Sequence, residues 1–319
     1  MQRYIGQRLI LAVPTLLGLS MFVFFAINIL MPVDAVDVSL GTLEVNAAPG
    51  RADEIRKDLG IDGSPVEQYL RWLGGVAFRG DLGKSFYSHE PVAKELLARL
   101  PVSFEIGILA VIITVVIAVP AGILSAVKQD SFADLMLRGN ALVFHSVPGF
   151  WLAVLLIVLG GLWFGWVPSA HYMPLWEDPI ANLKQVLPPV LLLGLRPTGN
   201  MIRLVRTQVL EVIRQDYVRT ARAKGLASRQ VYFRHVLRNA LLPLVTVIGL
   251  EVPTVVSGTV IYETIFLLPG MGRFLIDALS KLDLFVILGA NLFFGSILVL
   301  SNLVVDISYG FIDPRVRVR

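Results

Sequence analysis

The chain has 319 residues, of which 55% are hydrophobic and only 16% are charged, and its mean hydropathy is +0.71. A soluble domain of ordinary composition carries about 25% charged residues, so these proportions exclude a typical soluble enzyme and indicate a membrane protein. The net charge of +4 does not indicate a nucleic-acid partner, because the basic residues gather at membrane boundaries. The absence of cysteine excludes disulfides, thiol nucleophiles and cysteine-ligated metal sites.

Six apolar segments are long enough to cross a hydrocarbon core of about 30 Å, which takes roughly 20 helical residues. We expect spans at about 9–31, 102–127, 139–164, 186–203, 239–262 and 286–308. The predicted fold class is an all-α membrane protein with six transmembrane helices. It forms a single domain over 1–319, with a long extracytoplasmic insertion at 32–101 between the first two spans and a cytoplasmic segment at 204–238. The fourth span contains three prolines, two glycines and Arg196, so we expect a broken helix there.

The orientation follows from the basic residues in the short loops, which stay in the cytoplasm. With the N-terminus inside, sixteen of the 28 Lys and Arg residues lie in inner segments, whereas the short outer loops hold only Lys184, Arg273 and Lys281. The loop at 32–101 is too long to count under this rule. We therefore predict that both termini are cytoplasmic.

The cytoplasmic segment at 203–238 carries nine basic residues and two acidic ones, which gives a net charge of +7. Helix-forming residues run from Arg203 to Lys224, Gly225 interrupts them, and Ser228 is placed to cap a second helix. We expect a helix, a glycine turn and a helix at the membrane surface. On charge alone, such a segment also fits a loop that only binds anionic headgroups.

Residues 216–226, followed by Arg234, His235 and 239–243, resemble the coupling signature of ABC-transporter permeases, in the form of the dipeptide, oligopeptide and nickel importer subfamily. Where the wider family has Glu-Ala-Ala, this chain has Arg219, Thr220 and Ala221, a departure that is usual in that subfamily. The resemblance implies that the coupling residues are Asp216, Tyr217, Arg219, Thr220, Ala221, Arg222, Ala223, Lys224 and Gly225.

Further segments resemble the same subfamily in the same order along the chain. They lie in the first external loop (58–62 and 80–85), the last external loop (263–266 and 269–272) and the tail (302–306 and 313–317). The resemblance implies a type I ABC importer permease for short peptides or related solutes such as nickel complexes, in the cytoplasmic (inner) membrane of a prokaryote. Its implied partners are a paralogous permease, two ABC ATPase subunits, an extracytoplasmic solute-binding protein and the lipid bilayer. ATP and Mg would bind to the ATPase subunits, and this chain would bind no cofactor.

Two charged residues fall inside predicted spans, where an ionisable group costs about 2.5 to 3.5 kcal/mol and usually lines a path or has a partner. They are Arg196 and Glu251, which we expect at similar depth, interacting directly or through water beside the translocation path. The alternatives are that Arg196 extends to the inner interface and that Glu251 is protonated beside Pro253.

The sequence gives little evidence for a nucleotide, metal or catalytic site. The sequence Gly83-Lys84-Ser85 resembles the end of a phosphate-binding loop, but position 78, where the first glycine of that motif belongs, is Phe78. The four histidines show no metal-ligand spacing, so we expect no metal site. No nucleophile and base have a compatible spacing, so we expect no catalytic residue. A secondary transporter or another small-solute channel is the alternative class. It predicts paired broken helices in an internal repeat, and only the fourth span looks broken.

Overall fold

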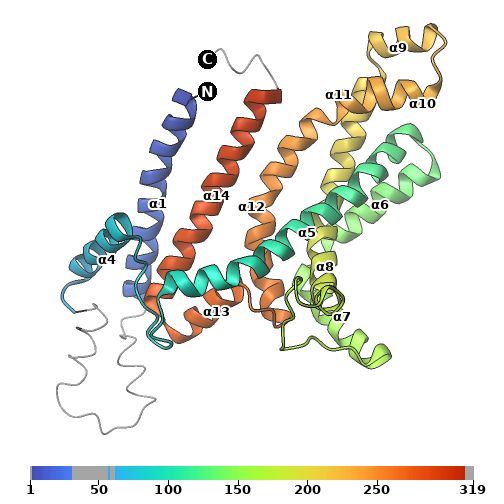
Figure 1. The fold of residues 1–319 in the computed structure, drawn as a ribbon. Coiled ribbons are helices and arrows are strands. Elements are labelled where there is room, and N and C mark those ends of the chain that lie inside the picture. Colours follow the sequence, from blue (N-terminus) through green and yellow to red (C-terminus); the bar gives the residue numbers. More distant parts are fainter. Residues whose placement is uncertain (1, 31–56, 58–61, 313–319) are drawn as a thin grey trace. The chain divides into compact units, whose positions relative to one another are not determined.

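The computed structural model describes residues 2–30, 57 and 62–312. Within these ranges the chain is nearly all helical, and the only β-pairing is an isolated bridge between Lys84 and Pro91 (Figure 1). The contacts form two compact units. One unit comprises Ser103–Leu268 and the chain from Ser301, and the other comprises Gln2–Val102 and Pro269–Leu300. Most of the predicted motif at 58–62, namely 58–61, and the predicted motif at 313–317 lie outside the described residues.

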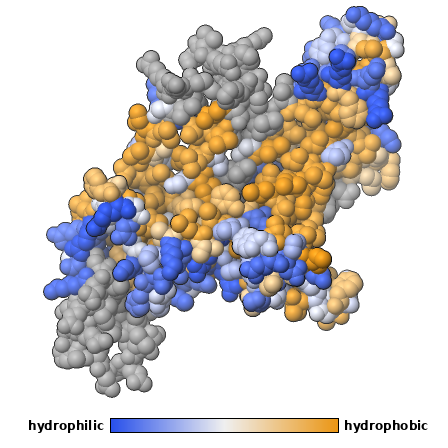
Figure 2. Space-filling view, in the orientation of Figure 1, coloured by the Kyte–Doolittle hydropathy of each residue, from blue (hydrophilic) through white to orange (hydrophobic). Residues whose placement is uncertain are grey.

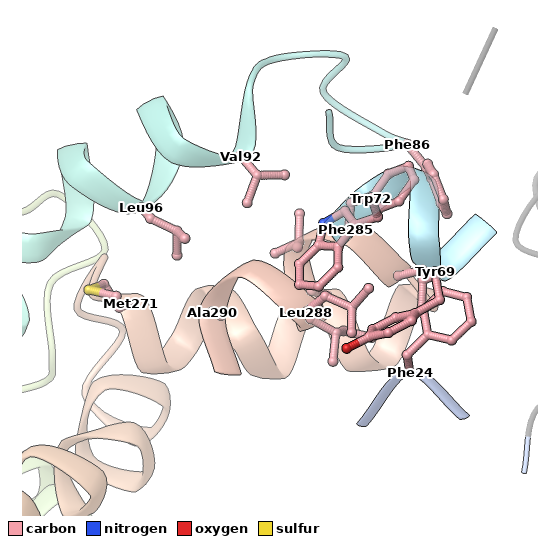
Figure 3. Packing of buried hydrophobic residues seen from close by; sticks show 14 residues of the cluster. Phe24, Tyr69, Trp72, Phe86, Val92, Leu96, Met271, Phe285, Leu288 and Ala290 are labelled. Carbon is pink, nitrogen blue, oxygen red and sulfur yellow. The ribbon is translucent and has the colours of Figure 1, made fainter. Parts of the chain in front are cut away.

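The unit containing the N-terminal helix is built from α1 (Gln2–Leu30), α4 (Pro65–Arg79), the start of α5 (Val92–Val127), α13 (Met271–Lys281) and the start of α14 (Leu284–Ile312). Its core is an aromatic cluster in which Phe24, Tyr69, Trp72, Phe86 and Phe285 are all less than 10% exposed (Figure 3). Tyr69 also shares a 3.0 Å hydrogen bond with the Ser20 hydroxyl of α1. These contacts fasten the amphipathic helix α4 to α1.

The Gly83-Lys84-Ser85 sequence has a structural role in this unit. The Ser85 hydroxyl donates to Asp283 Oδ2 at 2.6 Å, and the backbone N–H of Phe86 donates to the same oxygen at 3.1 Å. Asp283 immediately precedes α14 and is 3% exposed. A buried carboxylate needs such donors, so this motif joins the loop before α5 to the start of α14.

The second unit contains the rest of α5, α6 (Phe132–Ser146), α7 (Gly149–Phe164), α8 (Pro179–Ile213) and α12 (Leu242–Ile265). Its short helices are α9 (Asp216–Ala223), α10 (Ser228–Gln230), the π-helix η1 (Val231–Leu237) and α11 (Arg238–Ala240). Helix α8 packs along α6 and α12 (Figure 1). It also approaches α5 so closely that a Cβ at Gly194 would lie 2.7 Å from the carbonyl oxygen of Ala110.

Of the helices that the structure describes, three are long and apolar enough to cross a membrane: Gly6–Ile29, Val92–Val127 and Leu284–Val304. The segment Gly149–Phe164 is apolar but shorter. In Figure 2, hydrophobic surface follows the long helices, whereas hydrophilic surface lies around α9 and α10 and also around α4. Helix α5 begins at Val92, ten residues before the predicted second span, so the end of the predicted insertion is helical.

The sequence prediction placed the broken helix in the wrong span. Helix α8 is continuous although Pro188, Pro189 and Pro197 lie inside it. The hydroxyls of Thr114 and Thr198 both donate to the Gly194 carbonyl, at 2.7 and 2.8 Å. Packing against neighbouring helices and such hydroxyl donors is what lets a membrane helix tolerate proline.

The predicted third span at 139–164 is instead two helices, α6 and α7. The break is at Val147, whose extended backbone (φ −90°, ψ 129°) separates Ser146 from Gly149. Val147 precedes Pro148, and a residue before proline is disfavoured in the helical region. The prediction of a single helix over this span was therefore wrong.

Candidate coupling helix and polar cavity

Two residues, Arg214 and Gln215, separate the end of α8 from the start of α9. Arg214 caps α8, and Gln215 has an extended backbone (φ −70°, ψ 147°) that starts α9 at Asp216. Asp216 lies in the first turn of α9 and Arg222 in the last turn. Both charges interact favourably with the helix dipole and so stabilise a separate short helix. The prediction of one helix from Arg203 to Lys224 was therefore wrong at this junction.

The glycine turn after α9 was predicted correctly. Gly225 has φ +78°, a left-handed conformation that costs glycine little and most other residues much more. The predicted cap of the next helix was wrong, because Ala227 is the N-cap, Ser228 is the first helical residue and no side chain caps this end. The following helix includes the π-helical stretch η1, a rare form that often occurs at functional sites.

The inner face of α9 is fixed to the rest of its unit. Val218 is fully buried and Ala221 is 6% exposed, and both belong to an apolar cluster with residues of α5, α8 and η1. We call this the α9 cluster; its buried members are Ala118, Ala126, Met201, Ile202, Val205, Val209, Val218, Ala221, Val231, Val236, Leu237, Ala240 and Leu244. At the edge of the helix, Asn239 donates a 2.9 Å hydrogen bond to the Tyr217 hydroxyl.

The outer face of α9 is open. Asp216 and Arg219 have side chains 94% and 78% exposed, and they form a loose ion pair of 3.4 Å. The other exposed members of the predicted set are Tyr217, Thr220, Arg222, Ala223, Lys224 and Gly225. Ala221 is the exception, because it is buried in the α9 cluster. The predicted residues therefore divide into an anchored face and a presented face.

A buried ion pair, which the sequence reasoning missed, lies beside the α9 cluster. Asp134 of α6 is 0% exposed and accepts two hydrogen bonds from Arg206 of α8, at 3.0 and 2.9 Å. Ser125 of α5 also donates to Asp134, and Arg138 lies 3.3 Å away. Arg206 above all, together with the Ser125 hydroxyl, holds the pKa of Asp134 well below the ordinary range of an aspartate. Three helices are thus joined by one carboxylate close to α9.

Arg196 and Glu251 line one cavity, of about 470 Å³, between α7, α8 and α12. Arg196 is exposed and Glu251 is half-buried. Within the described chain, no ion pair of 4.0 Å or less joins them, so the predicted direct contact is not present in this structure. The remaining lining residues are Pro148, Gly149, Phe150, Leu193, Pro197, Asn200, Val255, Gly258, Ile261 and Tyr262.

Comparison with known proteins identifies the family. The model of the family "Binding-protein-dependent transport system inner membrane component" matches residues 118–318, and the model of the N-terminal part of such components matches residues 1–107. The chain is 38% identical over 317 residues to a peptide transport system permease protein of Brucella abortus (strain 2308), covering 99% of each chain. It is 36% identical over 340 residues to the dipeptide transport system permease protein DppB of Escherichia coli (strain K12), again covering 99% of each.

The structural comparison agrees at the level of the fold. The structure described as inward-facing conformations of the MetNI methionine ABC transporter has a TM-score of 0.55 at 16% identity, over 70% of this chain and 99% of that one. At this identity the likeness shows a shared fold only. Taken with the full-length relatives and the two matching family models, it shows that the chain belongs to the family of binding-protein-dependent transport system inner membrane components, as an ABC-importer permease of the peptide-importer subfamily.

Proposed function

We propose that this permease carries short peptides into the cell as one of two membrane subunits of an ATP-driven importer. The observation that carries the proposal is the 36% identity to dipeptide permease DppB over 99% of both chains. The di/tripeptide permease DppB of Pseudomonas aeruginosa is also 36% identical, over 337 residues. A secondary transporter or channel is not favoured, because the match to ABC permeases extends over the whole chain.

The proposed assembly contains a paralogous permease, two cytoplasmic ATPase subunits that bind ATP and Mg²⁺, and an extracytoplasmic binding protein. The exposed face of α9, around Asp216 and Arg219, docks on an ATPase subunit. Closure of the ATPase pair on ATP then moves α9. Because Val218 and Ala221 pack in the α9 cluster, this motion reaches α5 and α8 without an intervening flexible linker.

The proposed topology keeps six crossings, with both termini and α9 in the cytoplasm. Helices α1, α5, α8, α12 and α14 each supply one crossing, and α7 together with the end of α6 supplies the remaining one. The basic residues of the short loops support this orientation. The interrupted crossing lines the cavity through Pro148 and Gly149, which fits the rule that non-helical backbone at membrane depth faces protein or water.

Cysteine labelling tests the topology, because the chain contains no cysteine of its own. We expect an impermeant maleimide, added to intact spheroplasts, to label Ala77→Cys and Ala170→Cys but not Ser228→Cys. All three positions are exposed, so access to the reagent depends on the side of the membrane. Permeabilised cells should label all three variants equally. Labelling of Ser228→Cys in intact spheroplasts would contradict the proposed orientation.

Uptake by cells tests the function itself. Deletion of the gene should abolish uptake of radiolabelled dialanine in a strain that lacks its other dipeptide importers, and a plasmid copy should restore it. A deletion strain with undiminished energy-dependent uptake of dipeptides and tripeptides would refute the proposed substrate class.

A further inference from the structure

The cavity between α7, α8 and α12 is lined by one basic and one acidic side chain, Arg196 and Glu251. Among the residues that the structure describes, Arg196 and Glu251 have no hydrogen bond and no ion pair. An ionisable side chain inside a membrane protein persists mostly where it has a partner or serves a path. These two side chains are therefore open to partners from outside the chain.

The cavity has the size and lining of a small-molecule site. Its volume of about 470 Å³ falls within the 300 to 1,000 Å³ typical of ligand pockets. Leu193, Val255 and Ile261 supply an apolar wall, which can contact the side chains of a ligand without discriminating strongly among them. The polar side chains of the lining are Asn200, Tyr262 and the two charged residues, Arg196 and Glu251.

A free peptide carries the matching pair of charges. Near pH 7 its α-carboxyl is ionised and its α-amino group is largely protonated, because their ordinary pKa values are about 3.5 and 7.8. The ends of an extended peptide of two or three residues lie about 7 to 10 Å apart. A cavity lined by one basic and one acidic side chain that do not pair with each other suits such a ligand.

We infer that Arg196 and Glu251 form a dipolar subsite that receives the two ends of a transported peptide, with the guanidinium on the carboxylate and the carboxylate on the ammonium. This inference rests on the proposed function. The planar guanidinium matches a carboxylate in two parallel hydrogen bonds, which makes the contact specific as well as strong. The permease itself, in addition to the binding protein, then selects peptides with free termini.

Capped ligands test each end separately. The complex of both permeases and both ATPase subunits is purified without ATP and without the binding protein, and weak binding of dialanine is followed by saturation-transfer NMR. Dialanine amide lacks the carboxylate, and N-acetyl-dialanine lacks the ammonium. In the wild type, both capped ligands should bind at least about tenfold more weakly than dialanine, because each leaves a charged group unpaired.

Each variant should lose the ability to distinguish free from capped peptide at one end of the ligand only. Arg196→Gln should bind dialanine and its amide equally while still rejecting the N-acetyl ligand, and Glu251→Gln should do the reverse. Lys184→Gln and Glu211→Gln are matched controls, since both residues are exposed on α8 outside the cavity, and should keep both preferences.

Three results would overturn the subsite. They are a wild type that does not distinguish free from capped dialanine, variants that keep both preferences, and variants that each lose both preferences together. The last result would mean that the two charges act on each other or on the second permease. A wild-type complex that transports dialanine but shows any of these results leaves the proposed function standing, whereas one that transports no peptide refutes that function instead.

Discussion

Replacing Gly225 with valine is expected to abolish peptide uptake while leaving the membrane helices folded. Nothing lies within 4 Å of a Cβ at this position, so crowding is not the reason. The reason is the backbone, because φ +78° is strongly disfavoured for a β-branched residue. The turn after α9 must then change its course, and the exposed face of α9 is no longer presented to the ATPase subunits.

The measurement is recovery of the ATPase subunits with the tagged permease, together with dialanine uptake. Gly225→Asn should retain both, since asparagine tolerates left-handed backbone. Gly165→Val is the matched control, because it introduces the same backbone strain at another site. Gly165 ends α7 with φ +62°, and nothing lies within 4 Å of a Cβ there. It should recover ATPase normally. Normal recovery with Gly225→Val, or equal loss with Gly165→Val, would remove α9 from the coupling role.

Neutralising Asp134 is expected to produce the largest loss of stability in the described part of the chain. Asp134→Asn leaves Arg206 largely buried without its carboxylate, and breaking a buried ion pair in this way costs about 3 kcal/mol. The exposed pair of Lys94 and Glu90 provides the contrast, because Glu90→Gln should change the free energy of unfolding by less than about 1 kcal/mol. Unfolding in mixed micelles of dodecylmaltoside and SDS measures both variants.

A double variant separates the pair from its surroundings. Asp134→Asn combined with Arg206→Gln should cost less than the sum of the two single changes, because the second change removes the unpaired charge. Additive costs would show that the two side chains do not stabilise each other.

The contribution of Asp134 to the stability of the folded chain should decrease as the pH is lowered. The folded-state pKa of Asp134 is depressed, so its contribution to stability is fully present above the unfolded value of about 3.9 and is lost as the pH falls towards the folded value. The wild type should therefore lose stability below about pH 4 more steeply than Asp134→Asn.

Local rules in the sequence predicted some features well. The turn at Gly225 follows from a glycine between two helix-forming stretches. Glycine adopts a positive φ without support from contacts with other parts of the chain. The break at Val147 also has a local cause, because the residue before Pro148 is biased towards extended backbone. The prediction of a continuous third span did not take this bias into account.

Other features depend on contacts between distant residues and could not be read from one sequence. Helix α8 receives a hydrogen bond from α5, because the Thr114 hydroxyl, eighty positions before Gly194, donates to the Gly194 carbonyl. The pairing of Asp134 with Arg206 joins residues 72 positions apart, and nothing near either residue indicates it. Periodicity and turn chemistry report on neighbours along the chain, whereas these contacts are set by packing between helices.

Reconstitution tests the central claim most directly. Proteoliposomes containing this chain, its paralogous permease and the two ATPase subunits, with the binding protein supplied on the outside, should accumulate radiolabelled dialanine only when ATP is present inside. Liposomes containing this chain alone should neither hydrolyse ATP nor accumulate the peptide. Accumulation by the chain alone, driven by an ion gradient and indifferent to ATP, would contradict the account.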